Sequence, residues 1–400
     1  MNIQLLDLSA QYKSLETELK KAINSVLDSQ NFIMGSQVKE FEKEVNEYIG
    51  SNHAFGSASG SDALLLALMA IDVEPGDYVI TSPFTFFATA GAISRLGAIP
   101  IFIDIEPDSF NVDPAKVRDF LEGKDELSKK IKAPLDKIKA IIPVHLYGQM
   151  ADMDVIMDIA NEFDLYVIED AAQSIGSMYK GKNAGTIGDF GCFSFFPSKN
   201  LGAYGDAGLI TVKNEVLAEK VDILRLHGAK PKYHHKLVGI NSRLDTIQAA
   251  VLQVKLKHLE NWSNSRREIA SLYNAEFEKC GLLTDSFETS NSSRVITPKE
   301  TIGSLENDGK HIYHQYTIRI QKRDSLASYL NEQGIGNSVY YPVPLHMQEC
   351  FSNLGYVPDD CPEALLASKQ ALSLPIYPEL EVNQVEEVVS IIKDFLMKKG

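Results

Sequence analysis

The chain has 400 residues, more than one compact core usually covers, so its length favours two domains. Its 44% hydrophobic and 23% charged residues are typical of a globular protein with a sizeable core. The formal net charge of -15 argues against a general nucleic-acid binder, whose affinity depends on neutralising phosphates.

The beginning of the chain and its cysteines indicate a cytoplasmic soluble protein. MNIQLLDLSAQYKSLETELKK has no basic segment before a long apolar run, so no signal peptide is expected. No segment approaches the roughly 20 apolar residues needed to cross a bilayer, so no membrane partner is expected. The four cysteines lack CxxC spacing, which favours reduced thiols over a disulfide set or a zinc site, and no metal is predicted.

The first part of the chain alternates between helical and strand-like segments. Helical apolar spacing covers 16–27, 38–48 and 63–70. Further elements follow in this order: a strand in DYVITSP, a helix in FATAGAISRLG, strands in AIPIFIDI and IKAIIPVHLYG, a helix in MADMDVIMDIANEFD and a strand in LYVIEDAA. The strands are continuous apolar runs, as expected when helices cover both faces of a mainly parallel sheet. Ligands of such α/β sheets bind at the carboxyl ends of the strands.

The pattern changes after about residue 241. A long helical stretch, TIQAAVLQVKLKHLENWSNSRREIASLYNAEF, precedes a polar segment, 284–310, that we expect to form a loop or hairpin. A smaller α+β unit follows, with strands in IYHQYTIRI and IGNSVYYP around a helix in RDSLASYLNEQG. We therefore expect a large domain over 1–250, whose first residues are free to pack on the other unit, and a small domain over 251–400. The lysine-rich segment 124–139 is expected to be a surface insertion.

One lysine stands in an unusual place. In GCFSFFPSKNLGAYGDAG, Lys199 lies in a glycine-rich turn between two strand-like pieces. A lysine that does covalent chemistry needs a partly dry pocket and a lowered pKa, whereas an ordinary loop lysine faces solvent. The local sequence leaves both readings open.

A carboxylate follows another predicted strand. Asp170 in VIEDAAQS is placed either to cap a helix or to pair with a protonated heterocyclic nitrogen, as pyridoxal phosphate requires. Gln173, three residues further on, reaches the same ring face if the chain turns into a helix there.

Two more features point to the same cofactor. Gly60, Ser61 and Asp62 lead into a helix whose free N–H groups suit a phosphate, although a plain helix cap has the same sequence. Ser194 stands five residues before the lysine, and aromatic residues of PFTFFATA are able either to stack on a flat ring or to pack in the core. Together, a phosphate seat, a ring-nitrogen carboxylate, a stacking aromatic and a sheltered lysine predict a pyridoxal 5'-phosphate site.

The chain closely resembles the sugar aminotransferases of the DegT/StrS type, within the fold type I pyridoxal-phosphate enzymes. The resemblance rests on VIEDAAQSIGS, FSFFPSKNLGAYGDAG and GINSRLDTIQAAVL, and it extends from DLSAQY and FIMGSQVKEFE to YYPVPLHMQ. It implies a large cofactor-binding domain with a mainly parallel sheet, a smaller C-terminal domain, and a homodimer with shared active sites.

The resemblance also implies a role for each site residue. Lys199 matches the lysine that bonds to the cofactor aldehyde, and Asp170 matches the partner of the ring nitrogen. The other implied cofactor contacts are the ring neighbours Phe86 and Gln173, the phosphate cradle of Gly60, Ser61, Asp62 and Ser194, and Asn241 of the other subunit. The implied contacts to a nucleotide-sugar are Arg243, Tyr340, Tyr341 and His346, the last without an assigned role.

The implied reaction moves an amino group from L-glutamate to a nucleotide-linked keto-sugar, with a preference for a UDP- or dTDP-linked 3-keto sugar. The product would be an amino sugar for surface polysaccharide or glycoconjugate synthesis. A 4-keto substrate is the nearest alternative. A sugar dehydratase on this scaffold is disfavoured because Lys199 is present, and the intact set of site residues argues against a regulator without turnover. A dinucleotide oxidoreductase would need GxGxxG after the first strand, where TSPFTF lies instead.

Overall fold

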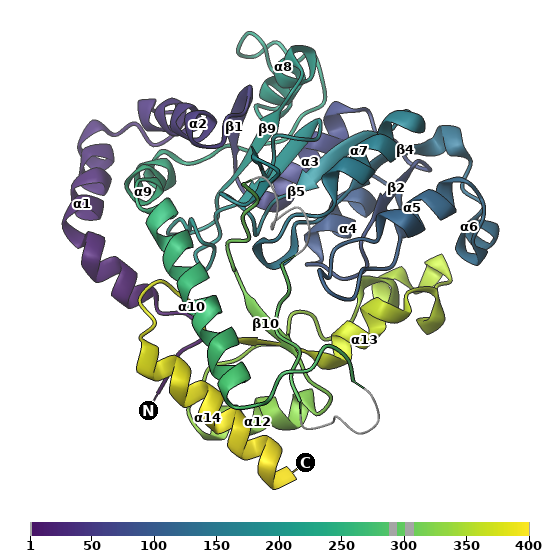
Figure 1. Cartoon of the computed structure of the whole chain (residues 1–400). Helices are drawn as coiled ribbons and strands as arrows, with labels where there is room; N and C mark the ends of the chain where they lie inside the picture. The colour runs from purple at the N-terminus through teal and green to yellow at the C-terminus, as the bar shows by residue number, and fades with distance from the viewer. Residues whose placement is uncertain (1, 288–293, 301–307, 400) are drawn as a thin grey trace.

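The computed structural model describes residues 2–287, 294–300 and 308–399, and its centre is a seven-stranded sheet (Figure 1). The strand order is β1-β9-β8-β5-β4-β2-β3. The bounds are β1 (His53–Ser57), β2 (Tyr78–Thr81), β3 (Ile99–Phe102), β4 (Ile138–Ile142), β5 (Tyr166–Asp170), β8 (Phe190–Ser194) and β9 (Gly208–Val212). Only β9 runs antiparallel to its neighbours, so the predicted mainly parallel α/β sheet is confirmed.

The strands are apolar throughout because alternate side chains enter two different cores. Ile141 and Val167 point into the core on one face of the sheet, and their neighbours Ile142 and Ile168 into the core on the other. The first core is closed mainly by α2 (Ser36–Ile49), α5 (Pro114–Leu121), α7 (Met153–Glu162) and α9 (Thr246–Leu256). The second is closed by α3 (Gly60–Ala70), α4 (Ala88–Arg95) and α8 (Glu215–Leu224). Burying both faces of the sheet in this way is the main stabilisation of this part of the fold.

A smaller α+β unit lies below the sheet in Figure 1. Its strands β10 (Tyr316–Arg319) and β11 (Ala371–Leu374) pair antiparallel. Its helices are α10 (Leu259–Lys279), α12 (Arg323–Glu332), α13 (Pro362–Gln370) and α14 (Val382–Lys399). Ile3 belongs to the core of this unit, and its backbone exchanges hydrogen bonds with Gly334 and Gly336 before α1 (Leu8–Ser29) begins. The first residues of the chain therefore pack on the small unit.

Three segments differ from the sequence-based expectation. The long helical stretch breaks at Lys257 and His258, where the chain turns from the sheet toward the small unit as α10. The lysine-rich insertion contains a short helix, α6 (Glu126–Ile131), and ends in β4. IGNSVYYP forms no regular strand, because its pairing is divided between single bridges to Ile3 and Ser373.

The polar segment 284–310 lies partly outside the described residues, which omit 288–293 and 301–307. Within the part that the structure describes, Val295 and Ile296 form isolated bridges with Leu283 and Arg319. Among the helices of the described ranges, none is long and apolar enough to cross a membrane.

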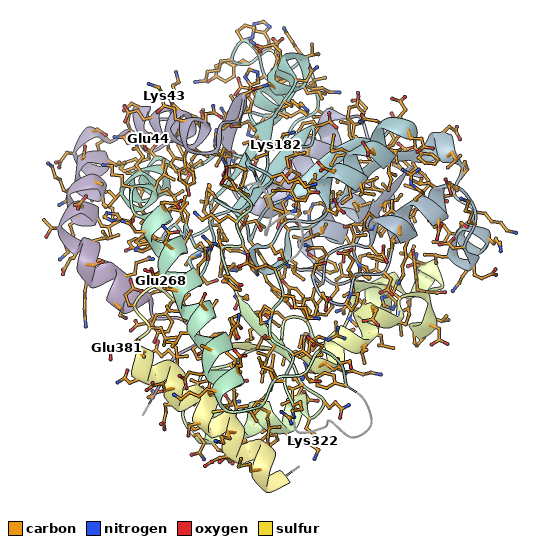
Figure 2. The ribbon with its side chains drawn as sticks, viewed as in Figure 1. Lys43, Glu44, Lys182, Glu268, Lys322 and Glu381 are labelled. Atoms are coloured by element: carbon orange, nitrogen blue, oxygen red, sulfur yellow. The ribbon has the colours of Figure 1, made fainter. Side chains whose placement is uncertain are left out.

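Charged side chains lie mostly at the periphery (Figure 2). Lys43, Lys182, Glu268 and Lys322, labelled there, are all exposed. Because burying a charged group without a partner is costly, buried carboxylates and amines are candidates for functional groups.

Candidate active site

The predicted catalytic residues meet at one edge of the sheet. Strands β4, β5 and β8 are parallel neighbours, so their carboxyl ends lie side by side. Asp170 is the last residue of β5, Ser194 is the last of β8, and Lys199 lies in the turn that follows β8. This edge is where open α/β sheets bind their ligands.

Asp170 is a buried carboxylate held by neutral donors. Its side chain is 5% exposed. It accepts hydrogen bonds from the Thr89 hydroxyl at 2.7 Å and from the Ala172 N–H at 3.2 Å. Burial raises the pKa of Asp170, and these hydrogen bonds together with the charge of Lys199 act against that rise. A carboxylate in this setting is suited to hold a protonated ring nitrogen.

Lys199 is half-buried at the end of a tight turn, in which its N–H donates to the carbonyl of Phe196 at 2.8 Å. Burial lowers the pKa of the Lys199 amine to about 8, and the negative charge of Asp170 acts in the opposite direction. The unprotonated fraction of the amine at neutral pH is therefore much larger than that of an ordinary lysine, although the protonated form still predominates, and the unprotonated form is the nucleophile.

The start of α3 forms the predicted phosphate seat. A Cβ added to Gly60 would lie 2.7 Å from the Cβ of Ser194, and one added to Gly208 would lie 2.3 Å from the backbone of Ser59. These close approaches bring the ends of β8 and β9 against the helix N-terminus. The N–H of Asp62 already donates to the Ser59 hydroxyl at 3.1 Å. The N–H groups of Gly60 and Ser61 have no acceptor one turn back, and they suit a phosphate together with the Ser194 hydroxyl.

The predicted ring contacts, Phe86 and Gln173, both meet Tyr341. Phe86 is 58% exposed, and its ring centroid lies 6.4 Å from that of Tyr341. Gln173 accepts from the Tyr147 N–H at 2.8 Å and donates to the Tyr341 hydroxyl at 3.1 Å. Gln173 therefore ties the loop after β4 to the Tyr340–Tyr341 pair.

The other predicted substrate residue of this segment is placed differently. His346 is 2% exposed, and neither ring nitrogen has a hydrogen-bond partner among the described residues. Burial lowers the pKa of His346 to about 4, and its ring meets that of Tyr356 edge-on at 6.0 Å. Direct contact between His346 and a substrate would require neighbouring side chains to move.

Asn241 and Arg243 flank the phosphate seat from a loop of the same chain. The hydroxyl of Ser242, between them, accepts from the Ala58 N–H at 3.2 Å, just before α3. The exposed Asn241 lines one groove together with Ser61 and Asp62.

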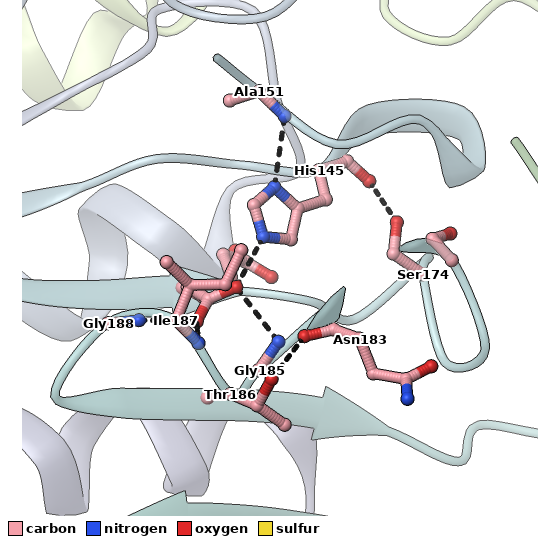
Figure 3. A network of polar contacts seen from close by, with 12 residues as sticks. His145, Ala151, Ser174, Asn183, Gly185, Thr186, Ile187 and Gly188 are labelled. Atoms are coloured by element: carbon pink, nitrogen blue, oxygen red, sulfur yellow. Dashed lines mark hydrogen bonds and ion pairs between the residues drawn. The ribbon is translucent and has the colours of Figure 1, made fainter. Parts of the chain in front are cut away.

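A network of hydrogen bonds around Glu169, the neighbour of Asp170 in β5, contains residues that the sequence analysis did not single out (Figure 3). The His145 ring accepts from the Ala151 N–H through Nδ1 at 3.2 Å, so its Nε2 carries the proton and donates to Glu169 at 2.8 Å. The Glu169 carboxylate also accepts from the backbone N–H groups of Gly185, Ile187 and Gly188. This network fixes the ends of β4 and β5. The sequence feature that could have pointed to this network is the glutamate, Glu169, inside the otherwise apolar strand of VIEDAAQS.

Thr89, the direct partner of Asp170, was also missed. It lies in FATAGAISRLG, which the periodicity identifies only as a helix. Its role depends on the packing of α4 against the end of β5, which local sequence does not show.

The donor set fits pyridoxal 5'-phosphate at each part of the molecule. The α3 N-terminus and Ser194 suit the phosphate, Asp170 suits the ring nitrogen, and Lys199 suits the aldehyde. Among the residues that the structure describes, no group of three or more His, Cys, Asp or Glu side chains could hold a metal ion. The fold and the site thus define a pyridoxal-phosphate-dependent enzyme.

Comparison with known proteins identifies the family. The model of the DegT/DnrJ/EryC1/StrS aminotransferase family matches residues 13–393, and the chain belongs to that family. It is 49% identical, over 99% of both chains, to a pleiotropic regulatory protein of Geobacillus stearothermophilus. It is 38% identical to a UDP-N-acetyl-3-dehydro-α-D-glucosamine 3-aminotransferase of Acidithiobacillus ferrooxidans, over 98% of this chain and 97% of the relative. A DegT/DnrJ/EryC1/StrS aminotransferase structure from Brucella abortus superimposes with a TM-score of 0.89 at 35% identity, covering 98% of this chain and 99% of that one.

Proposed function

We propose that this enzyme transfers the amino group of L-glutamate to a nucleotide-linked keto-sugar, with a UDP- or dTDP-linked 3-keto sugar as the preferred acceptor. The observation that carries the proposal is the half-buried Lys199 in the turn after β8, at the sheet edge that also holds the buried Asp170. The amine at this position favours amino transfer over the sugar dehydration that a family member without the lysine would perform.

Each of the site residues has a distinct task in this reaction. Pyridoxal 5'-phosphate, when bound, withdraws electrons from the carbon that loses its proton. Lys199 would hold the cofactor at its aldehyde, and its amine would also be the group that takes the proton from the α-carbon of the amino donor. Asp170 keeps the ring nitrogen charged, with its own carboxylate oriented by Thr89. The backbone N–H groups at the start of α3 hold the phosphate end in place.

The sugar end of the site is assigned to the remaining predicted residues. Tyr340, Tyr341 and Arg243 would contact the nucleotide-sugar, and an arginine suits a diphosphate or a sugar carboxylate. The preference for a 3-keto group is supported by the Acidithiobacillus ferrooxidans relative, which is named for amination at position 3. Amination at position 4 is the alternative.

The same proposal includes a homodimer with shared active sites, in which Asn241 and Arg243 serve the partner's site. The apolar Phe32 and Ile33 are 36% and 51% exposed, and Ile33 pairs with Asp245 just beyond this loop. Exposed apolar side chains beside Arg243 support a protein interface there. The reaction would take place in the cytoplasm, in keeping with the four free cysteines of the described residues.

A regulatory role is the second candidate, because one relative is named a pleiotropic regulatory protein. A regulator that only binds the cofactor has no need for a lysine with a lowered pKa beside a buried carboxylate, so we favour the enzyme.

The deciding experiment offers UDP- and dTDP-linked 3-keto and 4-keto sugars with ¹⁵N-labelled glutamate and measures the products by mass spectrometry. We expect ¹⁵N in one amino sugar, most with a 3-keto substrate, and none with the Lys199→Ala variant. Cofactor binding without turnover across the panel would favour the regulatory role, and turnover by Lys199→Ala would contradict the assigned mechanism.

A further inference from the structure

The residue that follows the catalytic lysine makes an unexpected contact. Asn200 is 5% exposed, and its Oδ1 accepts a hydrogen bond from Nδ1 of His314 at 2.9 Å. The other amide atom, Nδ2, is buried and has no partner within the described residues. The side-chain hydrogen bonding of Asn200 therefore depends on one residue 114 positions away.

His314 is itself held firmly, in the segment that leads into β10. The buried guanidinium of Arg266, on α10, donates to the carbonyls of Tyr313 at 3.3 Å, His314 at 3.4 Å and Ile376 at 2.9 Å. Bonds to three carbonyls fix the backbone of His314 relative to the small unit. The Asn200–His314 bond thus connects the small unit to the turn that bears the lysine.

The opposite side of the same turn is held by α9. Lys255 donates to the carbonyl of Gly202 at 2.7 Å. Gln248 bonds both the N–H of Tyr204 at 2.8 Å and its carbonyl at 3.3 Å. Hydrogen bonds from α9 therefore hold one end of the turn, and the hydrogen bond from His314 to Asn200 holds the other. Lys199 is the neighbour of Asn200 and so lies at the end that His314 holds.

The protonation state of His314 is compatible with this task. Burial, and then the nearby charges of Lys199 and Arg266, lower the pKa of His314 well below its ordinary value, so the ring is neutral at physiological pH. A neutral ring with its proton on Nδ1 donates to Asn200 without placing a second positive charge near the amine.

We propose that His314 is a positioning residue for Lys199, and that its bond to Asn200 fixes the turn that presents the lysine. This inference rests on the proposed role of Lys199 and adds a contribution of the small unit to it. Without the bond, both ends of the buried Asn200 amide lack partners, so the turn shifts and admits water to the lysine.

The test measures the protonation midpoint of Lys199 in the protein without cofactor. Acetylation rates at Lys199 are determined by quantitative peptide mass spectrometry over a series of pH values, and the midpoint does not depend on turnover. In His314→Phe and in Asn200→Ala we expect the midpoint to rise toward that of an ordinary lysine. A rise of one unit lowers acetylation near pH 7 about tenfold. The double variant should shift no further than the larger single effect, because both changes remove one bond.

Two further variants separate positioning from general damage. His314→Asn keeps a donor near the place of Nδ1 and should restore most of the wild-type midpoint. His311→Phe is the matched control, since His311 is a buried ring of the same segment that accepts from the Tyr313 N–H at 3.1 Å and bonds to the backbone of Gly148, not to the turn that bears Lys199. We expect it to leave the midpoint unchanged.

A wild-type midpoint in both folded single variants would overturn the inference, as would an equal shift in His311→Phe. If one single variant does not fold, the other decides alone; if neither folds, a wild-type midpoint in His314→Asn supports the inference and a raised one overturns it. This experiment and the test of the proposed function can fail independently. Turnover by Lys199→Ala tests whether the lysine is catalytic, whereas the protonation midpoint tests only whether His314 and Asn200 shape the environment of the lysine.

Discussion

The hydroxyl of Thr89 donates a 2.7 Å hydrogen bond to Oδ2 of Asp170. Both groups are buried, and this bond joins α4 to the end of β5. Because burial raises the pKa of Asp170 and Thr89 lowers it, the threonine helps to keep the carboxylate ionised. In the proposed reaction, where Asp170 holds the ring nitrogen, Thr89 would therefore act on the cofactor ring through Asp170.

Replacing Thr89 by valine tests this relationship with almost no change in shape. Hydrogen bonds to charged groups contribute about 1.5–3 kcal/mol, so Thr89→Val should lower kcat by roughly tenfold or more. The KM for glutamate should change little. Thr81→Val is the control, because Thr81 is a buried threonine that bonds the carbonyl of Ile142 instead. Equal kinetic effects in the two variants would show that Thr89 is only structural.

A second prediction concerns Asp170 itself. Asp170→Asn keeps the size of the side chain but removes the charge that holds the ring nitrogen protonated. We expect kcat to fall on the order of 100-fold or more, while the cofactor still binds through its phosphate. The measurements are steady-state kinetics and cofactor content by absorbance. Near-normal kcat would reduce Asp170 to a structural role, in which it accepts from Thr89 and from the Ala172 N–H of the turn after β5.

A third prediction concerns pH and Lys255. This lysine is 1% exposed, and burial lowers its pKa to about 8. An ordinary lysine in the unfolded chain titrates near 10.4, so the unfolded state binds more protons between the two values. Stability from this group is therefore lowest below pH 8 and rises as the pH increases toward 10.

The comparison is made with Lys255→Met, which lacks this titration. From pH 7 to pH 10 the difference in unfolding free energy should move in favour of the wild type, by on the order of 2 kcal/mol. Urea unfolding at each pH measures it. Lys257→Met, at an exposed position two residues away, should show no such trend. A flat difference for Lys255→Met would mean that the pKa of the buried amine is not lowered, so that it stays protonated as in the unfolded chain.

The residues of the central site could be predicted from the sequence where their position relative to a predicted strand was enough to place them. Asp170 comes at the end of a predicted apolar strand, and Ser194 lies in the strand-like piece before Lys199. Parallel neighbours bring such strand ends together at one edge of the sheet, where ligands are expected. Thr89 and His314 could not be predicted in this way. Their partners lie 81 and 114 residues away, and such contacts depend on how α4 and the small unit pack.

The burial of His346 was unpredictable for a related reason. It follows an apparent strand, but the segment folds as a short 3-10 helix, Leu345–Met347, and carries the histidine inward against Tyr356. The break between α9 and α10 shows the same limit. Apolar periodicity continues through Lys257 and His258, and only the position of the small unit requires the chain to turn there.

The last prediction tests the shared active site, for which the single chain offers a definite alternative. Asn241 lines a groove with Ser61 of its own chain, so the loop up to Arg243 is near its own phosphate seat. If Arg243 instead serves the partner, Lys199→Ala and Arg243→Ala subunits should complement each other when mixed. In a hybrid dimer, one site then combines an intact lysine from one chain with an intact arginine from the other. Random mixing gives about half hybrids with one good site each, so roughly a quarter of wild-type activity should return. Each variant is first assayed alone, and native mass spectrometry confirms the hybrids. If both residues serve the same chain, every site in the hybrid carries one defect, and activity stays at the level of the single variants.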